Sequence, residues 1–237
     1  MRLGIVVNVM DSDEVGATTY RLAADAVTNG HDVWIMSAGR LAYETDGTVQ
    51  ALGRAVPPGR YSSDELLQAL GSKRAINKPV VIDELDVLLL RNNPSAQVPW
   101  AQSSGIQFGR LATRRGVIVL NDPNGLAKAM NKLYLQTFPE CVRPRTLVTR
   151  HLDRVEEFLE DEGQIILKPL QGSGGTGVFI VRDSREHNLQ EIFKSISRDG
   201  YVVAQEYLPA AAEGDVRLFL MNGVPLQHQG KYAAFRR

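Results

Sequence analysis

The chain contains, between residues 165 and 181, the stretch Ile165-Ile166-Leu167-Lys168-Pro169-Leu170-Gln171-Gly172-Ser173-Gly174-Gly175-Thr176-Gly177-Val178-Phe179-Ile180-Val181. An apolar run leads to Lys168, a loop with four glycines follows, and a second apolar run begins at Val178. Glycines allow the backbone to approach a ligand closely and let several N–H groups point at one anion. With a lysine at the entrance of the loop, the stretch predicts a binding site for a nucleotide phosphate.

Three phosphate-binding motifs share features with this stretch, and none of them fits it completely. The spacing Gly172-x-Gly174-x-x-Gly177 matches the dinucleotide fingerprint, but that motif needs a helix directly after the glycines. Val178 to Val181 is β-branched and aromatic and therefore predicts a strand. A P-loop carries its lysine at the end of the loop, and the flap of protein kinases has its lysine downstream. The pattern predicts a β-hairpin flap with its lysine on the first strand, and a flexible surface hairpin is the structural alternative.

Composition and charge are those of an ordinary soluble globular protein. The 237 residues are 43% hydrophobic, and 27 basic residues balance 27 acidic ones. This length allows a large core and more than one domain. No basic field indicates nucleic acid, no apolar run reaches the roughly 18 residues of a membrane span, and no signal-peptide layout is present, so we expect a cytoplasmic protein. Cys141 is the one cysteine, which excludes an internal disulfide and predicts a packed thiol.

The first half of the chain predicts an α/β domain with a parallel sheet, covering residues 1–121. Apolar runs separated by a helical pattern form a β-α-β unit, and two more buried strands follow. Residues 40–62 carry glycine and proline and predict a loop or a short hairpin. The expected strands are Leu3–Val7, Asp32–Met36, Val87–Leu90 and Val117–Leu120, and the expected helices are Thr18–Val27 and a segment within Pro99–Arg114.

The second half predicts an α+β arrangement in two parts, residues 122–200 and 201–237. Asn222-Gly223 is a strong signal for a tight hairpin between the last two strands. The strand pattern extends to Arg237 without a terminal cap, so we expect the second domain to continue beyond this residue. The expected helices are Leu126–Phe138, His151–Glu162 and Leu189–Ile196, and the expected strands are Thr146–Thr149, Tyr201–Gln205, Val216–Met221 and Val224–Ala234.

Three further groups of residues in the second half suit nucleotide chemistry. Lys132 precedes Lys168 by about one helix and one strand, and two lysines can share one polyphosphate; the alternative is that each solvates a surface. The segment Ala204–Pro209 ends a strand, where exposed backbone groups can recognise an adenine edge. Glu213 to Arg217 offers acids for ribose hydroxyls and a guanidinium for phosphate or carboxylate, with a salt-bridged turn as the alternative.

These groups, taken in this order along the chain, resemble the ATP-grasp superfamily and most of all its prokaryotic glutathione synthetase family. The resemblance runs almost from end to end, and the lysine–glycine stretch is its most specific part. It also includes the strand start at Gly4, Asp11 with Thr18 and Thr19, and the segments Leu88–Arg91, Asn121–Pro123 and Asn131–Leu133.

The resemblance implies the roles of individual residues. Lys132 and Lys168 would hold ATP phosphates, and the loop from Gly172 to Gly177, including Ser173, Gly174 and Gly175, would close over them. Arg91 and Lys231 are candidates for binding a substrate carboxylate, and Arg217 is the candidate for the reacting end. The remaining implied contacts are with adenine, from Gln205, Glu206, Tyr207 and Leu208, and with ribose, from Asp215.

The implied activity is that of an ATP-dependent carboxylate–amine ligase with an acyl-phosphate intermediate, joining γ-glutamylcysteine to glycine. Another ATP-grasp amino-acid or peptide ligase, or a non-catalytic nucleotide-binding module, is the alternative. The family binds Mg²⁺ through Asp, Glu and Asn side chains in a later segment, so we expect no metal ligands here and place them beyond residue 237. Expected partners are a dipeptide and an amino acid, with no nucleic acid and no membrane, in a homo-oligomer.

Overall fold

The computed structural model describes residues 1–9, 18–92, 99–172, 174–183 and 188–236, with the backbone alone at residues 99–102. The chain forms two compact units. The first contains residues 1–135 together with residues 171–174, and the second contains residues 136–170 and 175–237. Each unit has a sheet and a core of its own.

The first unit is built on a six-stranded sheet with the order β4-β3-β2-β1-β5-β6. Strands β2, β1, β5 and β6 are parallel neighbours, which confirms the predicted α/β arrangement, while β3 and β4 add an antiparallel edge. The short hairpin that was one of the two expectations for residues 40–62 is confirmed, because the end of β2 pairs antiparallel with the next strand, β3. The strands are β1 Arg2–Val7, β2 Asp32–Tyr43, β3 Val49–Ala55, β4 Ile76–Val81, β5 Val87–Leu90 and β6 Ile118–Leu120.

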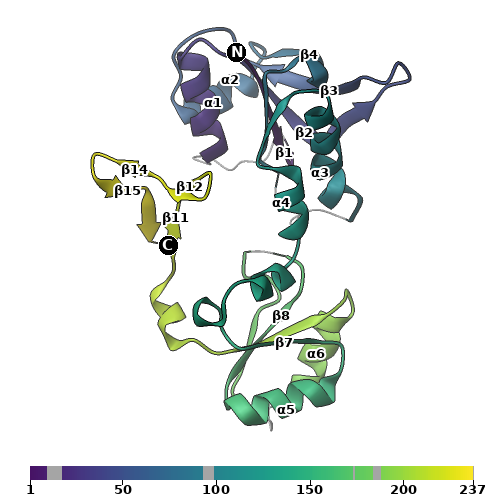
Figure 1. Ribbon diagram of the computed structural model, residues 1–237, viewed down its shortest axis with the longest axis vertical. Coiled ribbons are helices and arrows are strands. Elements are labelled where there is room, and N and C mark those ends of the chain that lie inside the picture. The colour runs from purple at the N-terminus through teal and green to yellow at the C-terminus, as the bar shows by residue number, and fades with distance from the viewer. Residues whose placement is uncertain (10–17, 93–98, 173, 184–187, 237) are drawn as a thin grey trace. The chain divides into compact units, whose positions relative to one another are not determined.

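Helices cover both faces of this sheet, with α1 Thr18–Thr28 and α2 Ser63–Leu70 on one side and α3 Pro99–Arg114 on the other (Figure 1). Successive side chains of a strand point to opposite faces. In β1, Ile5 therefore packs with α1 and α2, whereas Val6 packs in the core on the α3 side. Burial on both faces explains why the central strands read as continuous apolar runs. A single 3-10 turn, η1 Ile82–Glu84, leads into β5.

The helix predicted over Leu126–Phe138 is wrong as one element. The structure has a short helix α4 Pro123–Lys128 and, after a break, a 3-10 helix η3 Lys132–Thr137. Asp122 caps α4 by accepting a 2.7 Å hydrogen bond from the N–H of Gly125. At the break, Oδ1 of Asn131 accepts a 3.0 Å hydrogen bond from the N–H of Leu133. Such local side-chain bonds compete with helical bonding, which explains why the pattern does not continue as one α-helix.

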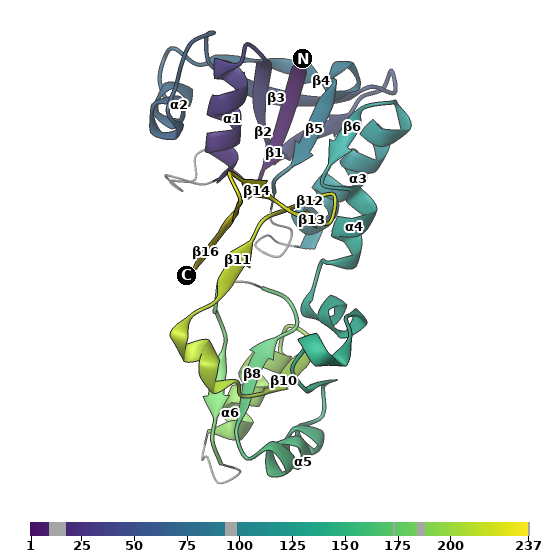
Figure 2. The same ribbon diagram turned by 60° about the vertical axis from the view of Figure 1, so that its left-hand side comes forward.

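The second unit contains a four-stranded antiparallel sheet with the order β7-β10-β8-β9. Its strands are β7 Thr146–Thr149, β10 Val202–Glu206, β8 Ile165–Pro169 and β9 Phe179–Val181. The helices α5 Leu152–Glu162 and α6 Leu189–Ser197 cover the same face of this sheet (Figure 2). Their apolar side chains bury Ile165, Leu167, Val202 and Ala204 in one core. Neither of the two α-helices described in this unit packs on the opposite face.

The end of the chain forms three short ribbons, so the two long strands predicted over Val216–Met221 and Val224–Ala234 are wrong. Asn222-Gly223 does form the predicted tight turn, with positive φ at both residues, and Gln229-Gly230 forms a second turn of the same kind. The second turn shortens the predicted final strand. The elements are η5 Pro209–Glu213, β11 Val216–Leu218 paired with β16 Ala234–Arg236, β12 Leu220–Met221 paired with β13 Val224–Pro225, and β14 Gln227–His228 paired with β15 Lys231–Tyr232.

Cys141 lies on the 3-10 turn η4 Glu140–Val142 and is exposed, so the expectation of a packed thiol is wrong. The turn buries none of its residues, so the thiol has no core in which to pack.

Within the ranges that the structure describes, no helix has the length and apolar character needed to cross a membrane.

Candidate functional site

Lys168 projects from β8 on the face of the second sheet opposite to the α-helices α5 and α6. Its strand neighbours Ile165 and Leu167 are fully buried against α5 and α6, so the alternation of the strand directs Lys168 the other way. Its Nζ donates a 2.7 Å hydrogen bond to Oε1 of Gln205. Burial lowers the pKa of the Lys168 amine, because desolvation penalises the charged form. A bound anion would stabilise this half-buried ammonium.

We call this surface the helix-free face. Its members follow from the strand register, in which residues directly opposite each other in an antiparallel pair share a face. Lys168 lies opposite Val203, and Gln205 lies opposite both Ile166 and Thr146. Three polar side chains, Thr146, Lys168 and Gln205, lie on this face among apolar ones. Its described members are Thr146, Val148, Ile166, Lys168, Ile180, Val203 and Gln205.

The glycine loop is the connection of the predicted β-hairpin, and the antiparallel pairing of β8 with β9 confirms that hairpin. Gly172, Gly174, Gly175 and Gly177 have φ values of +95°, +72°, +80° and +70°. Residues with a Cβ rarely adopt this left-handed conformation, which explains the glycines. Ser173, the remaining predicted contact of the loop, lies outside the described residues.

Lys132, the first predicted phosphate lysine, contacts the beginning of this loop. Its Nζ donates 3.0 Å hydrogen bonds to the carbonyl oxygens of both Gln171 and Gly172. Lys132 and residues 171–174 belong to the same compact unit. The lysine is therefore bound to the loop backbone, and its contact with a phosphate stays a prediction.

The predicted adenine-binding segment, from Gln205 to Leu208, is divided by strand alternation. Gln205 lies on the helix-free face, whereas Oε1 of Glu206 accepts a 2.9 Å hydrogen bond from the N–H of Arg145. The N–H of Tyr207 is bonded to the carbonyl of Gln164 at 3.3 Å. No acceptor within the described residues meets the N–H of Leu208, so this group is free to contact a base.

The predicted ribose and reacting-end residues lie beside each other at the start of β11. Nε of Arg217 is 3.6 Å from Oδ2 of Asp215, and each side chain is 51% exposed. An exposed ion pair of this kind contributes about 0–1 kcal/mol to the stability of the fold. Stability alone therefore does not explain why these two residues are present. Lys231 is exposed on the β14–β15 ribbon. The roles of all three residues stay predictions.

Arg91, the candidate for a substrate carboxylate, follows directly after β5. Its Nε donates a 3.2 Å hydrogen bond to Oγ1 of Thr19, at the beginning of α1. In the strand order of the sheet, β2 lies next to β1 on one side and β5 lies next to β1 on the other side. The direction in which the chain adds strands therefore reverses at β1. Ligands of open α/β sheets bind at such a switch point, outside the carboxyl ends of the strands. The geometry therefore favours Arg91 over Lys231 as a ligand-binding residue.

A magnesium site does not emerge from the described residues, which contain no group of three or more His, Cys, Asp or Glu side chains arranged to hold a metal ion. Magnesium needs several oxygen ligands in a compact octahedral arrangement. The residues that the structure describes thus do not fit a metal centre of their own.

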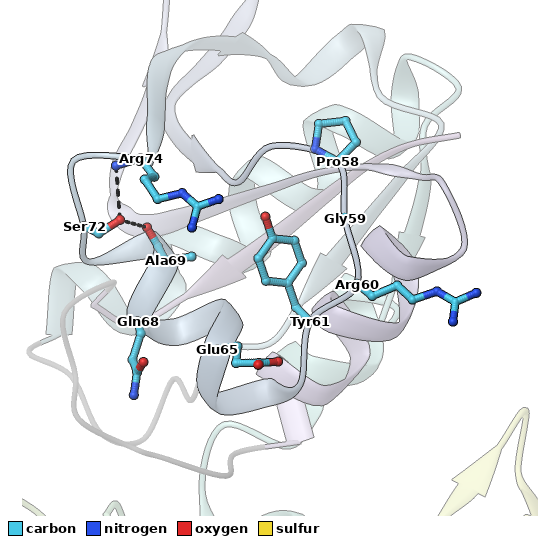
Figure 3. Close-up of a pocket in the computed structure, with 9 residues that line it drawn as sticks. All are labelled: Pro58, Gly59, Arg60, Tyr61, Glu65, Gln68, Ala69, Ser72 and Arg74. Atoms are coloured by element: carbon cyan, nitrogen blue, oxygen red, sulfur yellow. Dashed lines mark hydrogen bonds between the residues drawn. The ribbon is translucent and has the colours of Figure 1, made fainter.

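A cavity of about 530 Å³ lies in the first unit, beside α2 (Figure 3). The ring of Tyr61 and the side chain of Arg74 border it, and Ser72 accepts a hydrogen bond from the N–H of Arg74. None of the residues predicted to bind nucleotide or substrate lines this cavity. Its lining consists of Pro58, Gly59, Arg60, Tyr61, Glu65, Gln68, Ala69, Ser72 and Arg74.

Comparisons with known proteins agree along the whole chain. The sequence model of the prokaryotic glutathione synthetase N-terminal domain matches residues 1–127, and that of the same family's ATP-grasp domain matches residues 131–236. The glutathione synthetase of Pseudomonas putida is 32% identical over 96% of this chain and 69% of its own length. The glutathione synthetase of Pseudomonas syringae pv. tomato is 32% identical over 80% of this chain and 66% of its own length. The chain thus spans about two thirds of the relatives it matches.

Solved structures show the same fold at low sequence identity. The D-alanyl-alanine synthetase A of Vibrio cholerae superimposes with a TM-score of 0.58 and 12% identity, over 98% of this chain and 65% of that protein. The fold and the lysine–glycine hairpin define an ATP-grasp protein. More narrowly, the chain belongs to the prokaryotic glutathione synthetase family.

Sequence reasoning missed Thr146, although this residue contacts a predicted site residue. Oγ1 of Thr146 accepts a 2.9 Å hydrogen bond from Nε2 of Gln205. Thr19 is part of the family resemblance, and the structure adds its hydrogen bond from Arg91. A polar residue in a short apolar strand is a weak signal, because its partner is decided by strand pairing rather than by local spacing.

Proposed function

We propose that the chain is the larger part of an ATP-dependent carboxylate–amine ligase of the glutathione synthetase type. The observation that carries the proposal is Lys168, a half-buried ammonium bonded to a neutral amide and located directly before the glycine loop. Family membership supports the particular reaction. Two further expectations, a homo-oligomer and a cytoplasmic location, stay predictions.

The reaction consists of two transfers. A carboxylate oxygen of γ-glutamylcysteine attacks the γ-phosphorus of ATP, which releases ADP and leaves an acyl phosphate. The amine of glycine then attacks the acyl carbon, loses a proton and expels inorganic phosphate, which completes the peptide bond. Such chemistry depends on positioning, on positive charge around the transferred phosphoryl group and on exclusion of water.

The residues of this chain would contribute to the first transfer. Lys168 would bind ATP phosphate through its charge, and N–H groups of the glycine loop would surround the phosphates. The apolar part of the helix-free face and the free N–H of Leu208 would accept the base. In the first unit, Arg91 would orient a substrate carboxylate with its planar guanidinium.

Magnesium is general in ATP-grasp ligases, where it would neutralise phosphate charge. The described residues do not provide a ligand set for it. We therefore assign no step of the reaction in this chain to a metal ion.

The test uses the chain fused to the part of the Pseudomonas putida relative that it does not match, because the chain covers 69% of that protein. ADP release is measured with γ-glutamylcysteine plus glycine and with other acid–amine pairs. We expect turnover with the first pair, and its loss in the Arg91→Ala variant. Turnover with a different pair alone would overturn the glutathione assignment and leave an ATP-grasp ligase of other specificity.

A second candidate is a nucleotide-binding module without catalysis. The observation that favours it for the isolated chain is the lack of a metal-binding group among the described residues. Calorimetry of the isolated chain with ATP, and an ADP-release assay on the same sample, distinguish the two. We expect binding without turnover from the isolated chain, and ligase turnover by it would refute the module.

A further inference from the structure

Three hydrogen bonds form a continuous relay across the helix-free face. Lys168 Nζ donates to Gln205 Oε1 at 2.7 Å, and Gln205 Nε2 donates to Thr146 Oγ1 at 2.9 Å. Thr146 Oγ1 in turn donates to the carbonyl oxygen of Pro144 at 2.8 Å. The three side chains come from β8, β10 and β7, so the relay crosses three neighbouring strands.

The chemistry of the two ends fixes the direction of every bond in the relay. A carbonyl oxygen can only accept, so the single hydroxyl proton of Thr146 is directed at Pro144. The Thr146 oxygen must therefore accept from Gln205, and the amide NH₂ of Gln205 must face it. The amide oxygen is left to face Lys168, whose ammonium can only donate. Both ends require the same orientation of the amide.

The strand register makes the contact between Lys168 and Gln205 possible. Lys168 is directly opposite Val203 in the β8–β10 pair, and Gln205 is two residues further along β10. Such diagonal neighbours are about 7–8 Å apart on one face, within reach of long side chains. Gln205 is directly opposite Thr146 in the β10–β7 pair, which brings the second bond into range.

We propose that Gln205 is a positioning residue that holds the ammonium of Lys168 on the helix-free face without neutralising it, with Thr146 fixing the orientation of the amide. This inference rests on the proposed function, because the ammonium is held for an ATP phosphate. It also gives Gln205 a different role from the adenine contact implied by family resemblance.

An amide suits this role better than a carboxylate. A carboxylate at position 205 would form an ion pair with Lys168, cancel its charge and repel the phosphate. An amide oxygen supplies a hydrogen bond and carries no net charge. Among the described residues that face this side from β7, β8, β9 and β10, Lys168 is the one titratable group, and the others are Thr146, Val148, Ile166, Ile180, Val203 and Gln205. The positive charge therefore remains available to a ligand.

The experiment combines a double-mutant cycle with a measurement on the nucleotide-free chain. ATP affinity is measured by calorimetry for the parent, Gln205→Leu, Lys168→Ala and the double variant, with Thr146→Val and Gln205→Glu in addition. We expect Gln205→Leu to weaken ATP binding about tenfold. The same change in the Lys168→Ala background should have no further effect, because Gln205 acts through Lys168. Gln205→Glu should weaken binding and Thr146→Val should weaken it less than Gln205→Leu.

The nucleotide-free readout is the pKa of the Lys168 amine, followed by NMR of labelled lysine. The Gln205→Leu change should lower this pKa, because it removes an acceptor for the charged form, and Gln205→Glu should raise it. A purely structural role would change the thermal stability of the chain and leave this pattern absent. If Gln205→Leu does not fold, Gln205→Met and Thr146→Val carry the same measurements.

The outcomes separate this inference from the proposed function. Failure of the folded parent to bind ATP would contradict the proposed function. The pKa of the Lys168 amine, measured without nucleotide, would then be the one remaining test of the contact between Lys168 and Gln205. Equal affinity of the parent and Gln205→Leu would overturn the positioning role. A loss of affinity of the same size in the Lys168→Ala background would also overturn it and would show that Gln205 touches the nucleotide directly.

Discussion

At the residue scale, the environment of Lys168 differs from that of an ordinary surface lysine. It is half-buried, its bonding partner is neutral, and burial lowers its pKa. Burial of a charged amine costs free energy, so a lysine that served only to solvate the surface would remain exposed to water. The arrangement is better explained by a bound anion that restores the favourable environment of the charge.

The first prediction is that Lys168→Ala weakens ATP binding and leaves the fold nearly intact. Loss of one charge-assisted contact costs about 1.5–3 kcal/mol, or about ten- to a hundredfold in affinity. Calorimetry with ATP and a thermal unfolding curve measure the two effects. Lys194→Ala is the matched control, since Lys194 forms an exposed i,i+3 ion pair with Glu191. Parent-like ATP affinity of Lys168→Ala would refute the phosphate-binding flap.

The second prediction concerns pH. The folded-state pKa of Lys168 is lowered, while the unfolded chain titrates near the ordinary value of about 10.4. Between these two values the unfolded chain binds more protons, so stability rises with pH in this window. The contribution is complete above the unfolded pKa and is lost as pH falls through the folded pKa. Unfolding by urea across the alkaline range should show this slope in the parent and its absence in Lys168→Met.

At the element scale, the glycine loop is limited by backbone conformation rather than by crowding. A Cβ added at Gly172, Gly174 or Gly175 would meet nothing within 4 Å, but all three residues have positive φ. The loop thus has room for side chains in this structure, and its glycines are needed for the left-handed backbone. In the proposed complex, the open space beside them is where phosphates would approach.

The third prediction separates the effect of backbone conformation from the effect of crowding in the glycine loop. Gly174→Val should weaken ATP binding more than Gly174→Asn, because Asn tolerates the left-handed region and a β-branched residue does not. ATP affinity and the unfolding midpoint are measured for both variants. Equal losses in the two variants would mean that bulk, and not backbone conformation, limits the loop.

At the scale of the whole molecule, the three terminal ribbons expose an unusual amount of apolar surface. Val216, Met221 and Val224 are 70%, 66% and 65% exposed, and other large apolar side chains nearby are exposed as well. Extended apolar patches of this kind mark surfaces that are covered by another part of a protein or by a partner.

The fourth prediction follows from this surface. The isolated chain should bind a hydrophobic dye, and the triple variant Val216→Thr, Met221→Ser and Val224→Thr should bind clearly less of it. Val142→Thr is the matched control, because Val142 is 69% exposed on the separate turn η4. Dye fluorescence and light scattering report the outcome. Unchanged dye binding in the triple variant would show that the ribbons are not the exposed apolar surface in solution.

Local patterns in the sequence are sufficient for much of this architecture. The β-α-β start, the hairpin around the glycine loop and the Asn222-Gly223 turn were predicted because each depends on residues close together in the chain. The predictions failed where local alternatives compete. Asn131 divides the expected helix through a side-chain bond, and Gln229-Gly230 adds a turn inside an expected strand.

The choice of Lys168 also came from local sequence, because its apolar strand and its glycine loop are adjacent to it. Its partners could not be found in this way. Gln205 is 37 residues from Lys168, and Thr146 is 59 residues from Gln205. Only the pairing of β7, β10 and β8 brings the three side chains to one face, since a shift of one residue in any strand would turn its side chain to the other face. Residue type and spacing specify a lysine before a flap, and the register of the sheet specifies what holds that lysine.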